Sequence, residues 1–116
     1  MSGHYEPIVN DMVNTAFGAL AHPVRRGIVE RLASGRATVG QATSGLGVSK
    51  PAISRHLTVL EECGVVVRSI EGRTHRLGLD FAVLDEAVAW IEHQRAVWER
   101  MFDVVETYLE EQERSR

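Results

Sequence analysis

The sequence has few of the features that mark secreted, membrane-spanning or metal-binding proteins. It contains one cysteine, Cys63, which excludes an intramolecular disulfide and a cysteine-rich zinc site. No window approaches the ~18 consecutive apolar residues of a membrane span. The first 14 residues lack a basic-then-apolar signal pattern. We therefore expect a cytoplasmic protein that makes no contact with a membrane.

The side-chain arrangements that enzymes use are missing as well. No Ser/His/Asp, Cys/His or paired-carboxylate set lies on one predicted element, and no glycine-rich loop is suited to holding a phosphate. The five histidines are scattered along the chain: His4, His22, His56, His75 and His93. The 116 residues, of which 44% are hydrophobic and 25% are charged, are typical of one soluble globular domain. We expect a binding protein and not an enzyme.

Charge is distributed unevenly along the chain, although the net charge is only −3. Residues 22–79 carry nine Lys/Arg against four acids, whereas residues 1–21 carry a net charge of −2 and residues 80–116 a net charge of −6. A basic middle between acidic ends is typical of a chain that turns one patch toward a polyanion and keeps the remainder away from it.

Residues 49–64 are predicted to form a helix with both ends marked. Ser49 can accept a hydrogen bond from an orphan backbone N–H of the first turn. Pro51 falls in that turn, where a missing N–H costs little, and Gly64 can adopt the left-handed conformation that ends a helix. An apolar stripe at helical spacing faces a core; it consists of Ile53, Leu57 and Leu60.

The opposite face of this helix carries small residues, hydroxyls and two cations but no carboxylate. These residues are Lys50, Pro51, Ala52, Ser54, Arg55 and Thr58. A helix that enters the major groove of DNA must be slim and cationic, with donors near its N-terminus. An ordinary amphipathic surface helix could show the same pattern, so the neighbouring segments must decide between the two interpretations.

Three shorter helices are predicted before this one, at residues 10–20, 23–33 and 38–45. The first has more apolar positions than one stripe needs, and the third is short and rich in poor helix formers. Gly47 then permits a tight turn before the next helix. A short helix, a glycine turn and a Ser-capped helix form the sequence pattern of a helix-turn-helix.

Residues 65–79 are expected to form a β-hairpin. Two β-branched or alternating runs, 65–70 and 74–79, flank the loop at residues 71–73. The tip and outer positions carry four basic residues, which are Arg68, Arg73, His75 and Arg76. Cations are also common on solvated sheet edges, where they discourage edge pairing. Directly after a helix-turn-helix, however, a basic hairpin is typical of a wing.

Residues 81–111 are predicted to form one long helix, of ~45 Å at 1.5 Å per residue. Two adjacent apolar stripes follow a 4-3 alternation along it, and Gln94 and Arg95 interrupt both at one level. Such a wide face could be buried in the chain's own core, but it more often packs against a partner helix. The expected dimer interface consists of Met12, Val13, Phe17, Leu84, Val88, Ile91, Arg95, Trp98, Met101, Phe102, Val105 and Leu109.

The order of these elements resembles the ArsR/SmtB family of dimeric bacterial winged-helix repressors. The resemblance is carried by residues 20–28 (LAHPVRRGI), 48–57 (VSKPAISRHL), 59–66 (VLEECGVV) and by Gly72-Arg73. It implies a mainly α fold with a β-hairpin wing, a winged helix-turn-helix of four helices, two strands and a fifth helix. Residues 1–9 are expected to be loose, and residues 10–112 to form a single DNA-binding domain.

The resemblance also implies a dimer that binds an operator, an imperfect inverted repeat in double-stranded DNA, and represses its own or neighbouring genes. The expected DNA-contacting residues are Thr38, Gln41, Ser49, Lys50, Pro51, Ala52, Ser54, Arg55, His56, Thr58, Arg68, Arg73, His75 and Arg76. The alternative is a winged helix that docks an acidic protein partner. Arg55 and its flanking hydroxyls on a small-residue helix favour DNA.

The sequence departs from the metal-sensing members of this family. A thiolate site would need Cys-x-Cys near the first helix of the helix-turn-helix, but residues 39–41 are Val-Gly-Gln. A site on the last helix would need paired ligands, and that helix has a single histidine, His93. We expect no regulatory metal, no cofactor and release by a non-metal signal. His56 and Cys63 are better explained by packing than as a metal ligand and a redox sensor.

Overall fold

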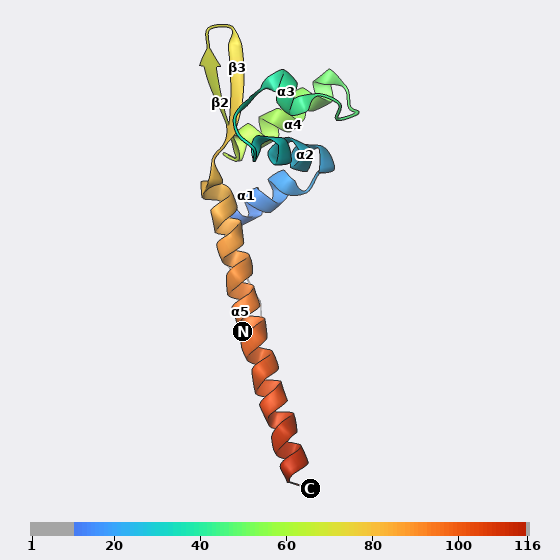
Figure 1. Cartoon of the computed structure of the whole chain (residues 1–116), viewed down its shortest axis with the longest axis vertical. Helices are drawn as coiled ribbons and strands as arrows, with labels where there is room; N and C mark the ends of the chain where they lie inside the picture. Colours follow the sequence, from blue (N-terminus) through green and yellow to red (C-terminus); the bar gives the residue numbers. More distant parts are fainter. Residues whose placement is uncertain (1–10, 116) are drawn as a thin grey trace, which may run out of the picture.

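The computed structural model describes residues 11–115, without the side chains of residues 11–13. Its elements, in order, are α1 (Asp11–Leu20), α2 (Pro23–Leu32), β1 (Ala37–Thr38), α3 (Val39–Thr43), α4 (Lys50–Glu62), β2 (Val66–Glu71), β3 (Thr74–Leu79) and α5 (Phe81–Arg114). This is the predicted winged helix-turn-helix. The helix-turn-helix and the wing occupy one end of the molecule, and α5 extends to the other (Figure 1). The predicted loose segment, residues 1–9, lies outside the described residues.

The core lies between the helices and the inner face of the sheet. Its completely buried side chains include Ile28 of α2, Leu60 of α4, Leu77 of β3, and Val65, which lies just before β2. Cys63, a half-buried small side chain, packs against this core. Burying each large apolar side chain stabilises the fold by ~1.5–3 kcal/mol. Gly64 has the left-handed φ of 76° that the sequence predicted for the end of α4. The chain therefore turns there directly into β2.

The sheet has three strands, and not the two of the predicted hairpin. Its order is β1-β3-β2, all antiparallel, with Thr38 of β1 opposite Arg76 of β3. Thr38 was expected inside a helix, but it is the extended N-cap of α3, with ψ of 160°. Its Oγ1 accepts from Gln41 N at 3.2 Å, and Gln41 Oε1 accepts from Thr38 N at 3.0 Å. This capping box starts the helix after Thr38, which stays extended and lies opposite Arg76 of β3.

Helix α5 is 34 residues long and ends three residues beyond its predicted end. Its first turns join the core of the described residues, where Ala87 is buried and Val83 and Leu84 pack against the core. Leu84, which was predicted in the dimer interface, is half-buried and packs against the chain's own core. The long axis of the molecule measures 76 Å. None of the described helices is long and apolar enough to cross a membrane.

Candidate nucleic-acid interface

Helix α4 presents the predicted outward face to solvent. Ser49 caps it by accepting a hydrogen bond from Ala52 N at 3.3 Å, and Leu57 and Leu60 fix its inner side in the core. The remaining residues of the predicted contact face are exposed, apart from the half-buried Ala52; they are Lys50, Pro51, Ser54, Arg55 and Thr58. The apolar stripe therefore orients this helix so that its cationic side faces outward.

Three cations of this region are exposed and unpaired within the part of the chain that the structure describes. Lys50 and Arg55 lie on α4, and Arg73 lies in the two-residue turn of the wing. No carboxylate among residues 14–115, whose side chains the structure describes, lies within 4.0 Å of their charged groups. A cation without an internal partner keeps its full charge for an external anion, so these three are the best placed to contact a phosphate or a base.

Two other predicted contact residues already have carboxylate partners. Arg68 is half-buried, and its Nε donates to Oε1 of Glu61 at 2.5 Å while its NH1 lies 3.1 Å from His75 Nδ1. Arg76 Nε donates to Oε2 of Glu71 at 3.3 Å. Because Arg68 pairs with Leu77 and Arg76 with Ser69, the two arginines lie on opposite faces of the wing. Arg68 therefore anchors the wing to α4, and Arg76 is partly neutralised on the far face.

Thr38 and Gln41 of the helix-turn-helix are partly committed as well. In their capping box, the Thr38 hydroxyl oxygen accepts from the Gln41 backbone N–H, and the Gln41 side-chain amide oxygen accepts from the Thr38 backbone N–H. The Thr38 hydroxyl proton and the Gln41 NH2 group remain available as donors. Thr58 differs, because its hydroxyl donates to Ser54 O at 2.9 Å and can then only accept from a nucleic-acid group.

His56 differs from the other predicted contact residues of α4, because its ring already has partners within the protein. Its ring is half-buried and faces α2, with Nδ1 3.2 Å from Arg25 NH1 and its centroid 4.3 Å from that of His22. Burial lowers the pKa of the His56 imidazole, and the charges of His22, Arg25 and Arg55 lower it further. These effects favour the neutral form of the His56 imidazole.

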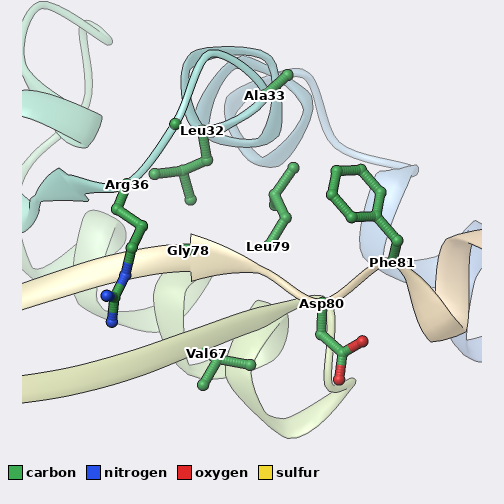
Figure 2. A pocket seen from close by; sticks show the side chains of 9 residues that line it. Leu32, Ala33, Arg36, Val67, Gly78, Leu79, Asp80 and Phe81 are labelled. Carbon is green, nitrogen blue, oxygen red and sulfur yellow. The ribbon is translucent and has the colours of Figure 1, made fainter.

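Arg36 braces the base of the wing, a role that was not predicted from the sequence. Its NH2 donates to Ser69 Oγ at 2.7 Å, and its stem lies beside Gly78, where an added Cβ would come within 3.3 Å of Arg36 Cγ (Figure 2). Arg36 and Asp80 flank an open hollow between the end of α2, the wing and the start of α5. The alternation of Arg36 with Thr38 would have revealed this position if β1 had been recognised as a strand.

Ile70 was not among the residues predicted for this surface, although it is a large apolar residue that is 64% exposed. It lies opposite His75 near the wing tip, on the same face as Arg68 and the buried Val66. The two-residue spacing of Val66, Arg68 and Ile70 could have predicted this position. The face of β2 that is buried in the core at Val66 becomes exposed toward the wing tip. An exposed apolar side chain at a wing tip can wedge against base edges in a minor groove.

The predicted dimer residues form an exposed apolar band along α5. Phe17 of α1 packs edge-on against Trp90, with ring centroids 5.9 Å apart, and both rings remain over 40% exposed. Farther along α5, Val88, Ile91, Trp98, Met101, Phe102, Val105 and Leu109 are each about half exposed or more. Arg95 pairs with Glu92 of the same helix at 2.7 Å. The side chains of Met12 and Val13 lie outside the described residues.

These features define a winged helix-turn-helix protein of the DNA-binding type, and comparison with known proteins agrees. A sequence family described as "Helix-turn-helix domain" matches residues 20–69. The chain is 32% identical over 79 residues to the transcriptional repressor SdpR of Bacillus subtilis (strain 168), covering 68% of this chain and 88% of SdpR.

Two further relatives extend this comparison. The HTH-type transcriptional regulator Rv2034 of Mycobacterium tuberculosis is 51% identical over 51 residues, or 44% of this chain, and the match spans about half (48%) of Rv2034. The solved ArsR-like transcriptional regulator from Rhodococcus sp. RHA1 has a TM-score of 0.68 at 28% identity, covering 81% of this chain and 89% of that one. The chain belongs to the ArsR family of helix-turn-helix transcriptional regulators, which confirms the predicted resemblance.

Proposed function

We propose that this protein is a cytoplasmic, dimeric repressor that binds an operator near its own gene and has no enzymatic activity. The observation that carries this proposal is Arg55, an exposed arginine on the outward face of α4 with no carboxylate partner among the described residues. A slim helix face with an unpaired arginine can present the guanidinium to guanine O6 and N7 in the major groove. The name of the relative SdpR, a repressor, supports the direction of regulation.

The two basic elements would divide the work of recognition. In this proposal Arg55 reads a base, and Ser54 and Thr58 contribute hydroxyls beside it. Arg73 in the wing turn contacts the sugar-phosphate backbone, which positions the protein without reading sequence. Arg68 holds the wing in place through Glu61.

The dimer would form through α1 and the exposed band of α5. Residues 10–112 then act as one domain, with α5 as its dimerisation helix. A two-fold dimer presents two recognition helices, so the operator is an imperfect inverted repeat with half-site centres one or two helical turns apart. Release is proposed to depend on a non-metal signal, because the sequence lacks the Cys-x-Cys and the histidine pair of the metal-sensing relatives.

A footprint on the intergenic DNA upstream of the protein's own gene tests this proposal. We expect protection of two half-sites on one face of the duplex and no protection of a scrambled duplex of equal length. Protection of a single half-site would contradict the dimeric operator. Absence of any retarded complex on specific and scrambled DNA alike would instead favour the alternative, a basic module that docks an acidic protein.

A further inference from the structure

Arg25 of α2 joins the end of α1 to the recognition helix. Its Nε donates to Ala19 O at 2.8 Å and its NH2 donates to Gly18 O at 3.0 Å, so it caps two of the last carbonyls of α1. Its NH1 lies 3.2 Å from Nδ1 of His56 on α4. The half-buried guanidinium of Arg25 therefore contacts both α1 and α4. Its partner on α4, His56, is the residue next to Arg55.

The chemistry of these contacts defines the protonation state of His56. A guanidinium has donors only, so His56 Nδ1 must be the acceptor and its ring proton must be on Nε2. His22 is constrained in the same way, because its Nδ1 accepts from Val24 N at 3.1 Å at the start of α2. A proton added to Nδ1 of His56 would remove the Arg25 hydrogen bond and place a second cation against the guanidinium.

The groups that face His56 all oppose that protonation. His22 and Arg25 lie on the α2 side and Arg55 on α4 itself; no carboxylate whose side chain is described, in residues 14–115, pairs with any of these groups. The surroundings thus disfavour protonation of His56, and the neutral ring keeps Nδ1 as an acceptor. At a pH below the ordinary pKa of histidine, protonation of His56 would place its positive charge beside those of Arg25 and Arg55.

We propose that Arg25 is a positioning residue for DNA recognition, which holds α4 against the end of α1 through His56. Because α1 packs on α5 through Phe17 and Trp90, this contact connects the helices expected to form the dimer with the helix expected to read DNA. The connection is made only while His56 is an acceptor, so acidification weakens it. The inference rests on the proposed DNA-binding function.

Arg26 supplies a matched control, since it is the next residue and also caps α1. Its NH1 donates to Leu20 O at 2.8 Å, and none of its hydrogen bonds among the described residues reaches α4. The test compares Arg25→Gln with Arg26→Gln in two measurements. One is amide hydrogen exchange of α4, and the other is affinity for labelled DNA from upstream of the protein's own gene. Arg25→Gln should speed exchange in α4 and weaken DNA binding about tenfold, as loss of a hydrogen bond to a charged group does. Arg26→Gln should leave both measurements nearly unchanged.

A second pair of variants tests the histidine. Asn at position 56 places an acceptor oxygen near the position of Nδ1 but does not titrate, whereas Leu removes the acceptor. His56→Asn should bind DNA like wild type at about pH 7.5 and exceed it several-fold at about pH 5.5, while His56→Leu should resemble Arg25→Gln at both values.

Two outcomes would overturn the inference. One is an equal effect of Arg25→Gln and Arg26→Gln on α4 exchange. The other is a wild-type pH profile that His56→Asn reproduces. If wild-type protein binds no DNA, the proposed function fails, yet hydrogen exchange still decides whether Arg25 holds α4. The two failures are therefore distinguishable.

Discussion

The Nε of Arg68 donates a hydrogen bond to Oε1 of Glu61, 2.5 Å away, and this contact joins β2 of the wing to the last turn of α4. Both side chains are 29% exposed, so solvent screens the pair less than it screens the Arg76–Glu71 pair on the far face. The pair therefore connects the wing to α4 at a point away from the turn at Gly72-Arg73.

Breaking this pair should loosen the wing and lower stability. Arg68→Ala should reduce the free energy of unfolding by ~1–2 kcal/mol, because it removes a charge-assisted hydrogen bond in a half-buried place. Arg76→Ala, the matched change in the exposed pair, should cost less than ~1 kcal/mol. Urea unfolding of both variants measures this. Equal losses would mean that Arg68 contributes no more than a surface ion pair.

Removal of the Arg55 and Arg73 side chains should affect DNA binding in different ways. Arg55→Ala should cost ~1–3 kcal/mol per half-site on the operator and relax discrimination at one position, because no guanidinium then reaches the base. Arg73→Ala should weaken operator and scrambled DNA alike, and should flatten the slope of log K against log salt by about one unit for each phosphate that the protein no longer neutralises. Binding of both variants over a salt series is the measurement. If Arg73→Ala alone changes the specificity ratio, the two roles are reversed.

The α5 band should control association. Trp98→Glu places a charge in the exposed band, where the Trp98 and Phe102 rings lie 6.2 Å apart, and should shift the protein to monomer at micromolar concentration. Each buried anchor of this kind contributes ~1.5–3 kcal/mol. Ala96→Glu adds the same charge to the same helix on its polar side and should leave the dimer intact. Sedimentation velocity separates the outcomes, and a wild-type monomer would refute the proposed interface.

Metal should not release the DNA. Titration of the protein–operator complex with zinc or cadmium should leave the fraction bound unchanged at stoichiometric metal, because the chain lacks the cysteine and histidine sets that such ions need. Anisotropy of labelled operator measures this, with EDTA-treated protein as the reference. Release at one metal per protomer would place the protein among the metal sensors.

Much of the fold could be predicted because its signals are local. The limits of α4 follow from Ser49, Pro51 and Gly64, each of which acts on its own few residues. Strand β1 could not be predicted in the same way. Its two residues pair with β3 nearly 40 positions later, and no pattern as short as Ala37-Thr38 indicates a strand without its partner.

The candidate site was predictable in its faces but not in its contacts. Helical spacing separated Arg55 from Leu57 correctly, yet it could not show that His56, between them, contacts Arg25 on α2. Helical spacing also could not show how far along α5 the packing against the core extends. Leu84 and Val88 belong to one stripe, but of these two only Leu84 packs on the core. Both facts depend on how separate elements pack, which residue periodicity does not encode.

The pH dependence of stability should carry the signature of His56. Its pKa is lowered in the folded protein, by burial first and then by His22, Arg25 and Arg55. Between that lowered pKa and the unfolded value of ~6.5, the unfolded chain binds more protons than the folded one, so stability must rise with pH across this window. The contribution is complete above the unfolded pKa and is lost as pH falls toward the folded pKa. Wild type should therefore lose more stability than His56→Asn when acidified from about pH 7 to pH 5.

Chemical unfolding of both proteins at each pH gives the comparison directly. Because the ring of His22 lies 4.3 Å from that of His56, the difference between the two curves reports the loss of the His56 imidazole together with its interaction with His22. Parallel curves would show that the folded and unfolded pKa values of His56 are the same, and a larger loss in His56→Asn would mean that folding raises the pKa of His56 instead of lowering it. A difference that grows only below the unfolded pKa of histidine, and levels off at lower pH, is the expected result.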